Sequence, residues 1–160
     1  MDIDYAIFMR WMVFVSFFAT LVLLVLTAGY GTLVRQIRKN NFQGLNIIFT
    51  DEEKSIKIHR QLARWVATAT VISVFLTEGY ASTIGRLSHN WFFWLHLSVA
   101  VGYVVLLILL LTKFTGLKAR PRVHKKLAYY CITFYALTLL TGLPRLFPEL
   151  LGNNFSWLLE

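Results

Sequence analysis

Histidine is the residue type through which this chain could do chemistry. Four histidines, His59, His89, His96 and His124, lie near the ends of long apolar segments. A neutral imidazole is a good ligand for iron and other transition metals, and it exchanges protons near neutral pH. The single cysteine, Cys131, excludes an internal disulfide and a thiolate metal cluster. It lies within an apolar segment, where we expect a small buried hydrophobe.

Two of the histidines begin short stretches that resemble each other. Residues 59–63 read His-Arg-Gln-Leu-Ala, and residues 124–128 read His-Lys-Lys-Leu-Ala. Each histidine lies about one helical turn outside the apolar run that follows it. Both should therefore lie at the same level of a membrane. If their helices face each other, the two imidazoles could bind one iron between them.

Haem suits such a gap because its iron takes axial histidines and its propionates need basic partners. Small residues follow one turn inward of each histidine: Ala63, Ala67, Ala128 and Cys131. Basic residues lie beside them: Arg60, Arg64, Lys125 and Lys126. Two alternatives remain open. A histidine beside Arg or Lys at a membrane boundary often only reaches into the headgroups, and the same pair could bind copper or zinc.

His96 lies deeper, about one and a half turns inside its apolar segment, where ionisable groups are rare and usually functional. Glu78, the one acid within an apolar segment, lies at a similar depth, and the two could bind a quinone headgroup or pass a proton. Alternatively, Glu78 only reaches the headgroups. Met9 and Met12 lie at the matching level and could ligate a metal with His96, although packing is the simpler role. His89 is expected in an exposed turn.

Four apolar segments must position these residues, in a chain of 160 residues of which 57% are hydrophobic. A transmembrane helix needs about 20 predominantly apolar residues. The sequence predicts one membrane domain over 1–160, with transmembrane helices at about 9–34, 60–82, 90–112 and 124–143 and an interfacial tail at 146–160. The short connections favour an all-α, up-down four-helix bundle.

The charge distribution predicts the orientation of this bundle. Thirteen of the 16 basic residues fall in two segments, 35–64 and 113–126, and loops rich in Lys and Arg stay on the cytoplasmic side. Both termini should then lie on the outer, periplasmic side of a bacterial cytoplasmic (inner) membrane. The net charge of +8 suits anionic lipids at the inner face better than nucleic acid.

Local signals predict where two of the helices begin and where one ends. Thr50 followed by Glu53 is typical of a capping box, so the second helix should begin well before its apolar part. Pro121 suits the first turn of the fourth helix. Gly142 and Pro144 are expected to end that helix.

Short motifs that contain the histidines resemble a known family. They are His59-Arg60, Leu95-His96, His124-Lys125-Lys126 and Leu139-Leu140-Thr141-Gly142. Over roughly residues 57–147 the chain resembles small four-helix membrane b-type cytochromes. More specifically, it is similar to short four-histidine bacterial membrane proteins associated with haem–copper oxidase maturation. The resemblance implies that His59, His96 and His124 are ligands. Those families usually place another histidine near the end of the second helix, where this chain has Thr77-Glu78-Gly79.

Two functions follow as expectations. The first is a membrane electron-transfer subunit with a b-type haem between His59 and His124, which exchanges electrons with a quinol or a partner subunit. The alternative is a cofactor-free accessory or assembly subunit of a larger respiratory or photosynthetic complex. The sequence has no nucleotide-binding loop or hydrolase motif, which favours a redox or accessory subunit over a self-contained enzyme.

Overall fold

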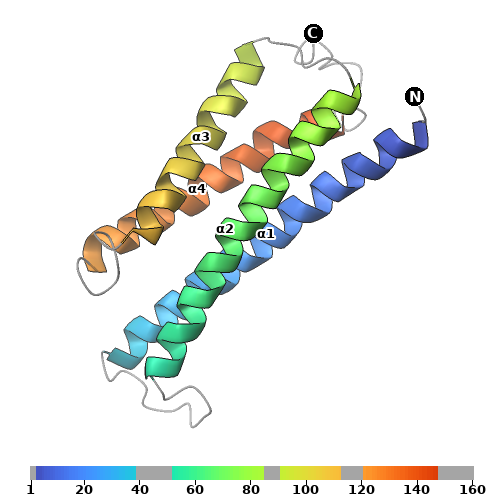
Figure 1. Cartoon of the computed structure of the whole chain (residues 1–160). Coiled ribbons are helices and arrows are strands. Elements are labelled where there is room, and N and C mark those ends of the chain that lie inside the picture. Colours follow the sequence, from blue (N-terminus) through green and yellow to red (C-terminus); the bar gives the residue numbers. More distant parts are fainter. Residues whose placement is uncertain (1–2, 39–51, 85–90, 113–120, 148–160) are drawn as a thin grey trace. The chain divides into compact units, whose positions relative to one another are not determined.

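The described part of the chain consists of four helices. The computed structural model describes residues 3–38, 52–84, 91–112 and 121–147. Within them lie α1 (Ile3–Arg38), α2 (Glu52–Ile84), α3 (Trp91–Leu111) and α4 (Pro121–Leu146), shown in Figure 1. The all-α prediction is confirmed for these residues. Each predicted transmembrane segment coincides with one helix, and α1, α2 and α4 extend beyond the predicted ends.

Three of these helices are long and apolar enough to cross a membrane: Asp4–Ile37, Trp91–Leu111 and Arg122–Pro144. Large apolar side chains cover their outer faces, as lipid contact requires; Leu140, for example, is 66% exposed. These features indicate an integral membrane protein. The 33 residues of α2 are long enough to span, but hydroxyl residues and Glu78 dilute the apolar part. That α2 is a fourth transmembrane helix therefore stays a prediction.

The chain divides into two compact units, which are described separately. The first, the α1–α2 unit, comprises residues 16–74. Thr20 and Ser73 are buried there, with 3.4 Å between their hydroxyl oxygens. Further along α1, Thr27 contacts His59. Partners advance along α1 as they go back along α2, so this part of the two helices is an antiparallel hairpin, visible in Figure 1.

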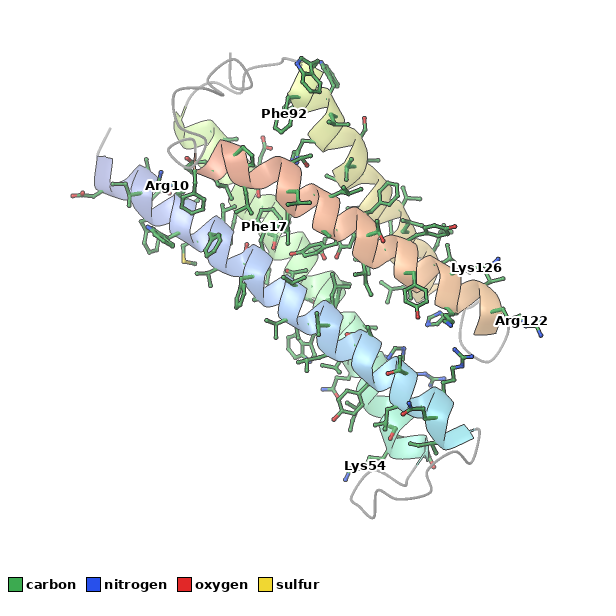
Figure 2. The ribbon with its side chains drawn as sticks, turned by 180° about the vertical axis from the view of Figure 1, so that it is seen from behind. Arg10, Phe17, Lys54, Phe92, Arg122 and Lys126 are labelled. Carbon is green, nitrogen blue, oxygen red and sulfur yellow. The ribbon has the colours of Figure 1, made fainter. Side chains whose placement is uncertain are left out.

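The second unit, the α3–α4 unit, comprises residues 1–15 and 75–160. His96 of α3 contacts Thr141, while the ring centroids of Tyr103 and Tyr135 lie 4.9 Å apart. This pairing is again antiparallel. Accordingly, Figure 2 places Phe92, near the start of α3, at the opposite end of the hairpin from Arg122 and Lys126.

The beginning of α1 packs within the same unit against the end of α4. The Phe147 ring lies 5.6 Å from that of Trp11 and 5.4 Å from that of Phe14, both in edge contacts. The guanidinium carbon of Arg10 lies 5.1 Å from the Phe147 ring centroid. This cluster of one cation and three rings ties two chain segments that are far apart in sequence.

The end of α4 differs from the prediction. Pro144 lies inside the helix, which continues to Leu146. The proline lacks its own N–H, but residues beyond it can still donate, and the Phe147 N–H bonds the Leu143 carbonyl at 2.9 Å. Two other predictions are confirmed: α2 begins well before its apolar part, and Pro121 starts α4. The Thr50 cap and the tail from residue 148 onwards lie outside the described residues.

Candidate functional site: two histidines packed on glycines

His59 lies in the third turn of α2 and packs on α1. Its imidazole Nδ1 lies 2.9 Å from the backbone carbonyl oxygen of Thr27. A carbonyl oxygen can only accept, so Nδ1 carries the proton and donates. In a neutral imidazole, the other ring nitrogen, Nε2, then carries the lone pair. The side chain is half-buried.

Gly31 makes this contact possible. A Cβ at this position would lie 3.2 Å from His59 Cε1 and 3.5 Å from Nδ1. Helical side chains lean toward the N-terminus and cover the turn before them, so residue 31 lies over the Thr27 carbonyl. Because residue 31 is glycine, the imidazole can reach that carbonyl from the side.

His96 is held in a similar manner in the other unit. Its Nδ1 lies 2.8 Å from the Thr141 hydroxyl oxygen on α4. That hydroxyl can donate its one hydrogen to the Leu137 carbonyl at 2.8 Å or the Thr138 carbonyl at 3.3 Å, and in either case its oxygen can accept from His96. A Cβ on Gly142 would lie 3.1 Å from His96 Cε1. In that arrangement His96 carries its proton on Nδ1, as His59 does.

The contact of His59 with the Thr27 carbonyl matches the support that a metal-binding histidine usually receives. Such histidines donate the N–H of their second ring nitrogen to a carbonyl, a carboxylate or a water, which fixes the orientation of the ring and makes the ligating nitrogen more basic. The same hydrogen bond also serves a simpler purpose, since polar side chains join helices within membranes. The geometry alone is compatible with both roles.

The other predicted site residues are placed as follows. His124 is half-buried in the second turn of α4. Because His59 and His124 belong to different units, their pairing stays a prediction. Glu78 is exposed, and His89 lies outside the described residues. The four basic residues expected near a haem are exposed: Arg60, Arg64, Lys125 and Lys126.

For Met9 and Met12, ligation of a metal together with His96 stays a prediction. Met9 Cε lies 3.2 Å from where a Cβ on Gly79 would be. Met12 is 40% exposed. Cys131 is buried, as the sequence predicts.

Sequence reasoning did not assign roles to Thr27, Gly31 and Thr141. The sequence did contain a signal: a threonine with a glycine about one turn away or next to it, as at 27–31 and 141–142. The glycine leaves a hydrogen-bond acceptor uncovered on the helix surface. The signal does not say which histidine will reach the acceptor.

Within the described residues, no three His, Cys, Asp or Glu side chains come together to bind a metal ion. A copper or zinc site with three protein ligands thus gains no support from them. Haem iron needs only its axial ligands from the protein.

Comparisons with models of protein families, with curated proteins and with solved structures find no match to this chain. The resemblance to membrane b-type cytochromes therefore rests on the short histidine motifs alone.

Proposed function

We propose that the protein is a membrane-embedded electron-transfer subunit that binds a b-type haem, with His59 as one axial ligand. The observation that carries the proposal is the 2.9 Å contact between His59 Nδ1 and the Thr27 carbonyl oxygen. The Thr27 carbonyl accepts a hydrogen bond from the ring nitrogen that would not bind iron, as is usual for ligating histidines. The lone pair then lies on Nε2, the nitrogen that would bind iron.

The residues around His59 fit the rest of such a cofactor. A bound haem would supply reversible one-electron chemistry. Arg60 follows His59 directly, and Arg64 lies one turn further along α2; both are exposed and can pair with propionates. By sequence, His124 is the proposed second ligand, with Lys125 and Lys126 as further propionate partners. His96 is a further candidate ligand, and His96 with Glu78 a candidate quinone or proton site.

The proposed surroundings are the bacterial inner membrane and other membrane subunits. Exposed Arg122, Lys125 and Lys126 at the start of α4 suit anionic lipid headgroups. The Lys125 ammonium lies 5.4 Å from the ring centroid of Tyr129, which is itself exposed. A lysine and a tyrosine in this order along a helix are typical of a membrane boundary.

The test is the visible spectrum of the purified protein, oxidised and then reduced with dithionite. We expect an α band of a b-type haem to appear on reduction. His59→Ala and His124→Ala should each abolish it. Gln61→Ala is the matched control, because Gln61 is exposed two residues from His59 on the same helix, and it should leave the band unchanged.

Two outcomes would contradict the proposal in different ways. A band that persists in His59→Ala would move the ligand to another histidine. A colourless wild-type protein, purified from cells supplied with haem precursor, would favour the cofactor-free accessory subunit.

A further inference from the structure

We infer that Gly31 and Gly142 are positioning residues that fix the tautomer of His59 and His96. Each glycine uncovers a hydrogen-bond acceptor on its helix, so that the histidine of the neighbouring helix donates through Nδ1 and keeps its lone pair on Nε2. The inference concerns the protein without cofactor. Only one consequence of the inference, that the Nε2 lone pair binds haem iron, rests on the proposed function.

The α1–α2 unit contains the first of these arrangements. The Thr27 carbonyl already belongs to the hydrogen-bond ladder of α1, and an imidazole can join it only from the side. Residue 31 lies on that side, one turn further along. With the ring atoms Cε1 and Nδ1 at 3.2 and 3.5 Å from an added Cβ, a methyl group would make the ring shift by a few tenths of an ångström, and a larger, branched side chain would displace it further from the carbonyl.

The α3–α4 unit repeats the arrangement with a side-chain acceptor. The Leu137 carbonyl lies 2.8 Å from the Thr141 hydroxyl oxygen, and we infer that the hydroxyl donates there and accepts from His96 Nδ1 at 2.8 Å. An added Cβ on Gly142 would lie 3.1 Å from His96 Cε1 and 3.7 Å from Nδ1. The two histidines lie in different units and use different acceptors. The common element is a glycine beside the acceptor.

The consequence is a chemical one. A neutral histidine can carry its proton on either nitrogen, and only the nitrogen without the proton can bind a metal or accept a proton. A fixed Nδ1–H therefore holds both imidazoles in the form that binds through Nε2. In haem binding, His59 would then need no change of tautomer before it ligates.

The experiment is nitrogen-15 NMR of histidine-labelled protein without haem, in lipid nanodiscs. Signals are assigned by their loss in His59→Gln and His96→Gln. We expect both histidines to show a protonated Nδ1 and an unprotonated Nε2. Gly31→Ala should weaken this pattern for His59, and Gly31→Val should replace it with a mixture of tautomers. His96 should be unchanged in both variants, which also reports that the protein remains folded.

Matched controls separate the effect from a general disturbance. Gly29 lies two residues away on α1 and has nothing within 4 Å of an added Cβ, so Gly29→Val should leave the His59 signals unchanged. Thr141→Val removes the acceptor and should release the tautomer of His96, whereas Thr141→Ser should retain it. A protonated Nε2 on either histidine in the wild type overturns the inference for that histidine, as does a Gly31→Val protein that keeps the His59 pattern. A fixed tautomer in a protein that binds no haem overturns the proposed function alone.

Discussion

Glycine marks the places where a side chain of one helix comes close to the backbone of another. Gly31 lies against His59, and Gly142 against His96. At Gly102, an added Cβ would lie 2.5 Å from Phe134 Cε1, closer than real contacts allow. Small residues of this kind let helices approach in membranes, where no hydrophobic force draws them together.

Gly102→Ala should therefore destabilise the protein, because the new methyl group must displace the Phe134 ring or separate α3 from α4. Forcing an extra carbon into packed helices costs about 1–3 kcal/mol. Thermal or denaturant unfolding of the purified protein measures the loss. Gly29→Ala is the control and should show no loss, since its Cβ meets nothing and alanine is the better helix former. Equal stability of the two variants would contradict the packing described for Gly102.

The candidate site could be predicted from the sequence only in part. Depth within an apolar segment singled out His96, because ionisable groups there are unusual. His59 was singled out because the stretch that it begins resembles the stretch that begins at His124. Their hydrogen-bond partners could not be predicted, since Thr27 and Thr141 contact them across helices, and a single sequence does not state the register between helices. The pairing of His59 with His124 stays a prediction for the same reason.

Helices α1 and α2 make polar contacts with each other. Thr20 and Ser73 are buried with their hydroxyl oxygens 3.4 Å apart, and each also bonds its own helix, at the carbonyls of Ser16 and Ala69. Polar groups in a membrane interior need such partners because lipid offers none. The register of the hairpin is thereby specified at one more point besides His59.

A double-mutant cycle with Thr20→Ala and Ser73→Ala should reveal this contact as a coupling free energy. Interhelical hydrogen bonds in membranes average about 0.6 kcal/mol in such cycles. The unfolding free energies of the two single variants, the double variant and the wild type give the coupling. Thr68 serves as the control, because it is exposed and bonds only its own helix at the Arg64 carbonyl, so Thr68→Ala should not couple to Thr20→Ala. A coupling of zero between Thr20 and Ser73 would show that the two hydroxyls only lie near each other.

At the level of elements, the sequence predicted the existence of all four helices, because long apolar segments leave few alternatives. The ends of the helices were harder to predict. Pro144 was expected to stop α4, yet the helix continues to Leu146, because residues beyond the proline can still donate, as the Phe147 N–H does to the Leu143 carbonyl.

For the whole molecule, the distribution of basic residues along the chain is the strongest indication of its orientation in the membrane. Two segments that hold 13 of the 16 basic residues alternate with apolar helices. Cytoplasmic loops retain Lys and Arg, so both termini should lie on the opposite side of the membrane.

Labelling of single cysteines with a membrane-impermeant maleimide tests this orientation. Asp4→Cys should react in cells whose outer membrane alone is permeable, and Gln36→Cys only after the inner membrane is opened. Both positions are exposed. Native Cys131 is 1% exposed and should stay unlabelled in either case, so the wild type serves as the blank. Reaction of Gln36→Cys from outside would show the inverse orientation.

The modest hydropathy of α2 also bears on the biogenesis of the protein. A segment with several hydroxyls and an acid gains little from entering lipid alone, whereas α1, which leaves the ribosome first, is apolar enough to insert unaided. Once α1 is in place, its Thr20 and its Thr27 carbonyl offer α2 the hydrogen bonds that lipid lacks. If α2 spans the membrane, its stable insertion would thus depend on α1 being in place first.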